Sequence, residues 1–195
     1  ALVAEREIAR AKAEGNEQPV IIYNLITSKA VPELVEKLGG RAVKTRVGHS
    51  FIKAVMAEES GIFGGEHSAH YYFKDFFNAD TGMLAAMHVL AALGGGNQAL
   101  SEISANYSPY VASGEINSEI EDKAAAVDRV RAHYAGAPVE VEDSDGTTFA
   151  AADGTWWFNL RPSNTELSLR LNVEAPDSAT METVRDTVLR IVREG

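Results

Sequence analysis

Residues 19–26, PVIIYNLI, form a short apolar run between two segments that are patterned like helices. The preceding segment is residues 2–15, LVAEREIARAKAEG, and the following one is residues 29–40, KAVPELVEKLGG, which ends at a glycine pair. A short apolar run bounded in this way predicts a buried strand. Buried strands that alternate with helices are typical of a mostly parallel, helix-covered sheet.

The same alternation continues along the first half of the chain. We predict a strand at residues 41–47, a helix at 50–60, a buried strand at 61–63 and helices at 79–93 and 99–106. We expect Gly64 and Gly65 to break the strand at 61–63. Ligands of parallel sheets bind where strands end, so residues 48–53 and 66–70 are expected to converge on one site.

The second half has a different pattern, in which strands follow one another. We predict strands at residues 114–122, 155–160 and 167–175, a hairpin over 139–154 turning at Asp145-Gly146, and helices at 123–136 and 178–194, the last capped by Ser178. This order indicates a smaller α+β domain with an antiparallel sheet and helices on one face. The predicted domains are residues 1–112 and 113–195.

The composition excludes several classes of function. The 195 residues include no cysteine, so disulfides, thiol chemistry and thiolate zinc sites are excluded, and a reducing cytoplasm is expected. The net charge of −10 argues against nucleic acid as a partner. The apolar segment 83–96 is too short to span a bilayer and is interrupted by His88, which we expect to be a buried structural residue. No signal peptide and no membrane partner are expected.

Polar side chains are concentrated at Glu66–His70, EHSAH. A solvated loop is the simplest interpretation. A zinc site at Glu66, His67 and His70 is a second one, although fixed pairs of zinc ligands come from helices and the preceding glycines argue against a helix. A ligand-binding loop is the third.

Four other features contain polar side chains. The segment RPSNTE, residues 161–166, is an ordinary turn or an anion site, and Arg170 on the next strand pairs with a surface carboxylate. His49 follows Gly48 at the N-terminus of a predicted helix, where a histidine is a cap or packing residue or acts on an anion. Lys53, one turn further on, faces either phosphate or solvent. Asp80 is expected to cap the following helix. The segment EDSDG, residues 142–146, is expected to be a hairpin turn and not a calcium loop.

Four motifs carry a resemblance to a known family. They are TRVGHSFIK at 45–53, GGEHSAHYYFKD at 64–75, NADTG at 78–82 and RPSNTE at 161–166. In this order and spacing they resemble the C-terminal half of the α-D-phosphohexomutases, with bacterial phosphomannomutase/phosphoglucomutase members as the best match. Each motif alone is weak, but four in order are specific.

The resemblance implies an activity and a set of residues. Members of the family interconvert hexose 1-phosphate and hexose 6-phosphate, of mannose or glucose, through a phosphoserine and a bisphosphorylated sugar. Residues 1–112 would be the third, sugar-binding domain and 113–195 the fourth, phosphate-binding domain. By resemblance, Glu66, Ser68 and His70 bind the sugar, His49 lies at the transferred phosphoryl group as a catalytic residue, and the phosphate is bound by Arg161, Ser163, Asn164 and Thr165.

The resemblance also implies what lies elsewhere. The family's serine loop and its magnesium loop belong to two N-terminal domains, and no segment of this chain matches them. We therefore expect Mg²⁺ in the full-length enzyme but no metal in this chain, with hexose phosphate and the N-terminal domains of the same polypeptide as partners. The isolated chain is predicted to be inactive as a mutase. The alternative is a stand-alone sugar-phosphate binding or regulatory module without catalysis.

Overall fold

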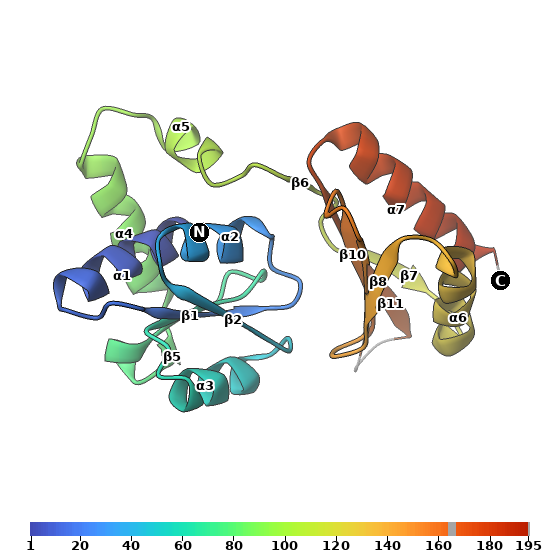
Figure 1. Cartoon of the computed structure of the whole chain (residues 1–195), viewed down its shortest axis with the longest axis horizontal. Helices are drawn as coiled ribbons and strands as arrows, with labels where there is room; N and C mark the ends of the chain where they lie inside the picture. Colours follow the sequence, from blue (N-terminus) through green and yellow to red (C-terminus); the bar gives the residue numbers. More distant parts are fainter. Residues whose placement is uncertain (164–166, 195) are drawn as a thin grey trace. The chain divides into compact units, whose positions relative to one another are not determined.

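The computed structural model describes residues 1–163 and 167–194 and divides the chain into two compact units (Figure 1). Unit 1 is Ala1–Pro109 and unit 2 is Tyr110–Gly195. The sequence-based boundary, after residue 112, falls directly behind β6 (Val111–Ala112), the first strand of unit 2, and so differs from the observed division by three residues. Among the described residues, no helix has the length and apolar character that crossing a bilayer requires.

Unit 1 is a five-stranded sheet covered by helices, with strand order β2-β1-β3-β4-β5. Strand β1 pairs in parallel with β2 and β3, while β4 and β5 continue the sheet antiparallel. Its elements are α1 (Leu2–Ala13), β1 (Val20–Asn24), α2 (Ala30–Lys37), β2 (Arg41–Thr45), α3 (His49–Glu58), β3 (Phe63–Gly65), β4 (Tyr71–Phe73), the 3-10 helix η1 (Lys74–Phe76), β5 (Ala79–Asp80), α4 (Gly82–Gly94) and α5 (Leu100–Ala105).

Strand β1 is buried on both faces, as its continuous apolar pattern predicts. Ile21 packs into a core with the buried residues of α1, whose apolar positions recur at helical spacing, whereas Ile22 packs on the opposite face against Ile52 and Met56 of α3. Figure 1 shows α1 and α2 on one side of the sheet and α3 on the other. The predicted helix-covered sheet is therefore confirmed, with a parallel centre and an antiparallel edge.

The prediction that Gly64 and Gly65 break the third strand is wrong. Both glycines lie inside β3, and Glu66 follows the strand directly. A Cβ at Gly64 would lie 2.8 Å from Cγ2 of Ile52 and 3.0 Å from Sδ of Met56. Gly64 therefore allows α3 to pack closely on the strand, which is a common role of glycine within strands.

Unit 2 is an antiparallel sheet of order β6-β11-β10-β9-β8, with β7 also paired to β11, and its two helices lie on one face (Figure 1). Its further elements are β7 (Ile116–Glu119), α6 (Lys123–Tyr134), β8 (Val139–Glu142), β9 (Thr147–Ala151), β10 (Trp157–Pro162), β11 (Ser168–Ala175) and α7 (Ser178–Arg193). The predicted α+β fold class is confirmed. Gly146 turns the predicted hairpin with a φ of 68°, a left-handed conformation that favours glycine.

Two predicted helix caps are wrong by one residue. Thr81, and not Asp80, caps α4, because the Thr81 hydroxyl accepts from the amide of Leu84. Asp177, and not Ser178, caps α7 by accepting from the amide of Thr180. Both observed caps have extended backbone, which is the conformation that an N-cap residue requires.

Candidate functional site

A pocket of about 460 Å³ lies at the carboxyl edge of the parallel strands of unit 1. We call it the strand-exit pocket, because the segments following β2 and β3 form its walls and β5 contributes a third side. It is lined by Val47, Gly48, His49, Lys53, Glu66, Ser68, His70, Tyr72, Ala79 and Asp80. The four candidate residues that the sequence places in this domain therefore line a single pocket.

Glu66 connects the elements around the strand-exit pocket. Its side chain is buried, and its Oε1 accepts a hydrogen bond from the backbone amide of Gly48 at 3.0 Å. Its Oε2 accepts from Tyr72 Oη at 2.8 Å, and Asn24 Nδ2 at the end of β1 donates to Oε1 at 3.4 Å. A carboxylate has about four acceptor positions, so one remains for a ligand. Burial, and secondly the bond to Glu66, raise the pKa of Tyr72.

Asp80 orients the loop on the other side of the pocket. Its Oδ2 lies 2.6 Å from His70 Nδ1, and its Oδ1 accepts from the amide of Tyr71 at 2.9 Å. The hydrogen bond to Asp80 raises the pKa of His70, although the imidazole is largely exposed. With Nδ1 held by Asp80, the Nε2 of His70 remains for a ligand.

His49 and Ser68 are exposed, and both line the pocket. His49 is the first residue of α3, after Gly48, whose φ of 131° favours glycine. His67 is also exposed but is not part of the pocket lining. Within the described residues, no group of three or more His, Cys, Asp or Glu side chains has an arrangement that would hold a metal ion, so the zinc interpretation of Glu66, His67 and His70 has no geometric support.

Arg161 and Ser163, the candidate phosphate residues that the structure describes, lie at the end of β10. Arg161 faces Arg170 across the β10–β11 pairing, and Glu115 lies between them, with oxygens 3.9 Å from Arg161 Nη2 and 3.5 Å from Arg170 Nη1. Ser163 Oγ accepts from Arg170 at 3.4 Å, and Lys123 Nζ donates to the Ser163 carbonyl at 3.5 Å. Arg170 and Lys123 thus contact Ser163, while Arg161 and Arg170 share the carboxylate of Glu115.

The sequence did not identify Arg170 and Lys123 as part of this basic cluster. Arg170 does pair with a carboxylate, Glu115, but only strand register shows that it stands opposite Arg161. The Nε of Arg161 is buried without a hydrogen-bond partner among the described residues. Asn164 and Thr165 lie outside the described residues.

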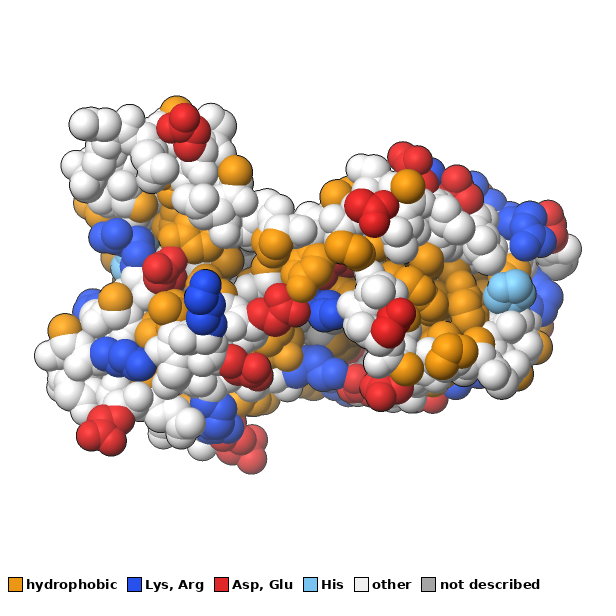
Figure 2. All heavy atoms as spheres, turned by 45° about the horizontal axis from the view of Figure 1, so that its top comes forward, with side chains coloured by type: hydrophobic (Ala, Val, Ile, Leu, Met, Phe, Trp, Pro, Cys, Tyr) orange, Lys and Arg blue, Asp and Glu red, His pale blue; other side chains and the backbone are white. Residues whose placement is uncertain are grey.

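A second cavity of about 530 Å³ lies between α1 and α4, remote in sequence from the candidate residues. We call it the α1–α4 pocket; its lining residues are Glu5, Arg6, Ala9, Arg10, His88, Ala92 and Tyr107. Figure 2 shows a hollow beneath the lobe of α4 and α5, with basic, acidic and histidine side chains along its wall.

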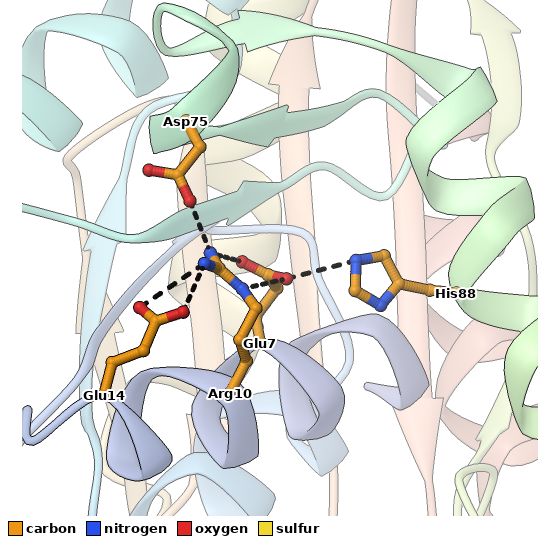
Figure 3. Close-up of polar contacts among 5 residues, drawn as sticks. All are labelled: Glu7, Arg10, Glu14, Asp75 and His88. Atoms are coloured by element: carbon orange, nitrogen blue, oxygen red, sulfur yellow. Dashed lines mark hydrogen bonds and ion pairs between the residues drawn. The ribbon is translucent and has the colours of Figure 1, made fainter.

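An ion-pair network around the buried carboxylate of Glu7 contributes two residues, Arg10 and His88, to the lining of the α1–α4 pocket (Figure 3). Glu7, with its side chain 3% exposed, pairs with Arg10 at 2.8 Å and with His88 Nε2 at 3.1 Å. Arg10 also contacts Asp75 at 2.8 Å and Glu14 at 3.1 Å. His88 stacks on Phe73, and burial lowers its pKa, so the expected structural role agrees with its contacts.

Comparison with known proteins matches both units to domains of the same protein family. Residues 1–110 match the family model described as phosphoglucomutase/phosphomannomutase, alpha/beta/alpha domain III, and residues 115–191 match the C-terminal domain of the same family. A phosphomannomutase of Methanocaldococcus jannaschii is 41% identical over 180 residues, which cover 92% of this chain and 38% of that protein. The chain thus spans about two fifths of this relative.

Solved structures show the same fold. A phosphoglucomutase/phosphomannomutase family protein from Burkholderia thailandensis matches with a TM-score of 0.80 at 23% identity, over 100% of this chain and 42% of that one. An N-acetylphosphoglucosamine mutase of Aspergillus fumigatus, solved with GlcNAc-6P and magnesium, matches with a TM-score of 0.64 at 15% identity, over 98% and 45%. At these identities the likeness concerns the fold.

Proposed function

This chain belongs to the phosphoglucomutase/phosphomannomutase family, and we propose that it supplies the sugar-binding and phosphate-binding half of a mutase acting on hexose 1-phosphate and hexose 6-phosphate, of mannose or glucose. The observation that carries this proposal is the strand-exit pocket. Three segments far apart in sequence meet there through one carboxylate, that of Glu66. The pocket combines hydroxyl, imidazole, carboxylate and ammonium groups, which suit a sugar phosphate.

Each pocket residue has a role in this proposal that follows from its chemistry. Ser68 both donates to and accepts from ring hydroxyls, and His70, held by Asp80, donates from Nε2. Glu66 accepts one hydroxyl at its remaining position. His49, at the N-terminus of α3, acts on the transferred phosphoryl group as a general acid or base, or by stabilising charge.

The second half of the proposal assigns the non-reacting phosphate to unit 2. A sugar phosphorylated at one end and reacting at the other needs a fixed anion site away from the reaction. Arg161, Arg170 and Lys123 supply positive charge near Ser163, and a guanidinium fork matches the oxygens of a phosphate. The ion pairs of Glu115 at 3.5 and 3.9 Å are loose, so a phosphate would displace its carboxylate. Asn164 and Thr165 complete the proposed loop.

The reactive serine and Mg²⁺ would come from N-terminal domains such as the longer relatives contain. Mg²⁺ would neutralise phosphoryl charge. We therefore propose that the chain alone does not turn over hexose phosphates.

Titrating mannose 6-phosphate into the ¹⁵N-labelled chain, with mannose and inorganic phosphate as partial ligands, tests the proposal. The sugar phosphate should shift the amide signals of Gly48 and Ser68, and inorganic phosphate those around Ser163. Ser68→Ala should weaken the first response, whereas His67→Ala, an exposed neighbour outside the pocket lining, should not. If saturating sugar phosphate moves neither set of signals, the assignment is wrong.

A mutase assay of the longer polypeptide separates the two functional alternatives. In a mutase, Arg161→Ala should weaken substrate binding by roughly ten- to a hundredfold, since a charge-assisted contact contributes about 1.5–3 kcal/mol. A polypeptide that binds sugar phosphate at both sites but shows no turnover with glucose 1-phosphate or mannose 1-phosphate would instead be a binding or regulatory module.

A further inference from the structure

The α1–α4 pocket contains one charged group that has no partner. Glu5 accepts a hydrogen bond from Tyr107 Oη, Arg10 is paired with three carboxylates, and His88 is bound to Glu7. Arg6, in contrast, makes no hydrogen bond or ion pair within residues 1–163 and 167–194, and its Nε is buried without an acceptor. An unsatisfied buried donor is rare in folded proteins and indicates a missing acceptor.

The position of Arg6 indicates that the missing acceptor would lie in the cavity. Arg6 lies four residues before Arg10 on α1, so both side chains lie on the same face of the helix. Arg6 lines the pocket together with His88 of α4 and Tyr107. A ligand bound in the hollow could therefore reach the guanidinium.

The surrounding charges determine what kind of anion fits. Arg10 is already outnumbered by Glu7, Glu14 and Asp75, so the network of Figure 3 offers no further positive charge. Among the cations of the lining, only Arg6 lacks a carboxylate partner within the described residues, and the Glu5 carboxylate in the same pocket would repel a second negative charge on a ligand. A singly charged, planar carboxylate matches the guanidinium fork better than a phosphate dianion does.

Three of the remaining lining residues, Ala9, Ala92 and Tyr107, offer apolar surface. Ala9 of α1 and Ala92 of α4 contribute methyl groups to the lining, and Tyr107 contributes its ring. A ligand that combines one carboxylate with an apolar body would use both properties of the site. We propose that the α1–α4 pocket binds a small organic monocarboxylate, whose carboxylate group pairs with Arg6. This site shares no lining residue with the strand-exit pocket and does not depend on the proposed function.

NMR titration of the 195-residue chain with benzoate at constant ionic strength tests this proposal. The side-chain Nε–H signal of Arg6 and the amides of Ala9 and Ala92 should shift and saturate in the millimolar range, the affinity typical of a single anchored carboxylate. Benzamide, the neutral analogue of similar shape, and inorganic phosphate, a dianion near neutral pH, should bind at least tenfold more weakly.

Three variants control the experiment. Arg6→Ala should weaken benzoate binding at least tenfold, and Arg6→Lys should restore part of the affinity, because an ammonium keeps the charge but not the fork. Arg185→Ala, which removes an arginine from α7 in unit 2, should bind benzoate like the unchanged chain. Folding of Arg6→Ala is checked by urea unfolding, and it should be at least as stable as the unchanged chain because an unsatisfied donor is removed.

Several results would overturn the proposal. They are shifts that do not saturate, equal binding of benzamide, and unchanged benzoate binding by Arg6→Ala. Should Arg6→Ala fail to fold, Arg6→Gln takes its place, since it keeps a polar side chain but removes the charge; benzoate binding by that variant at the original affinity would be equally decisive.

Discussion

Replacing Tyr72 with phenylalanine tests the hydrogen bond between Tyr72 of β4 and Glu66, which begins the candidate sugar-binding segment. Tyr72 is 1% exposed, and its ring packs with Ile22, Ile52 and Met56, which phenylalanine would still contact. The substitution therefore removes only the hydroxyl, whose hydrogen bond to Glu66 Oε2 is 2.8 Å long.

The expected loss follows from the partners that Glu66 retains. A hydrogen bond to a charged group contributes about 1.5–3 kcal/mol. Gly48 and Asn24 still donate to the other oxygen, so the carboxylate keeps part of its stabilisation and we expect the lower half of that range. With a urea dependence of about 2 kcal/mol per molar for a unit of this size, the urea midpoint of unit 1 should fall by roughly 1 M.

Two probes monitor urea unfolding, so that the unfolding of each unit is measured separately. Both tryptophans, Trp156 and Trp157, belong to unit 2, so their fluorescence reports that unit, while amide signals of β1 report unit 1. Tyr71→Phe is the matched control, since the Tyr71 hydroxyl makes no hydrogen bond within the described residues. A midpoint of Tyr72→Phe equal to that of the unchanged chain, or an equal fall in Tyr71→Phe, would refute the reasoning.

Three further predictions concern other contacts. Asp80→Asn should lower the pKa of His70 toward its ordinary value in an NMR pH titration, because the acceptor of the hydrogen bond that raises this pKa loses its charge. The stabilisation by the His70–Asp80 pair is complete below the ordinary histidine pKa and is lost as the pH rises through the raised pKa of His70. The variant and the unchanged chain should therefore converge in stability at alkaline pH. Gly146→Ala should lower the free energy of unfolding of unit 2 by about 2 kcal/mol or more, measured by tryptophan fluorescence, since φ is 68° and a Cβ would lie 2.4 Å from the carbonyl oxygen of Leu160. Glu115→Gln should tighten phosphate binding to unit 2 by about threefold or more in calorimetric titration, because a competing carboxylate is removed; weaker binding would contradict the proposed role of the basic cluster.

Hydrophobic periodicity was sufficient to predict the long elements. The buried run at β1 and the apolar spacing in α1 and α7 specify strand and helix locally. Strands β4 and β5 were not predicted, because segments of three and two residues are too short to show a period. The caps of α4 and α7 were misplaced by one residue, since several neighbouring side chains are capable of capping and the backbone conformation selects among them.

The sequence by itself determined which chemical groups are present and roughly where strands end. It identified Glu66, His70 and Arg161 as candidates from residue type and motif. Only the tertiary structure decided which groups meet: Glu66 bonds to Gly48 and Tyr72 across the sheet edge, and strand register places Arg170 opposite Arg161. Likewise, no local pattern indicates that Arg10 is satisfied by Asp75 while Arg6 is left unpaired among the described residues. The physical reason is that hydrogen bonds and ion pairs act over a few ångströms, so partners distant in sequence become defined only when the chain is folded.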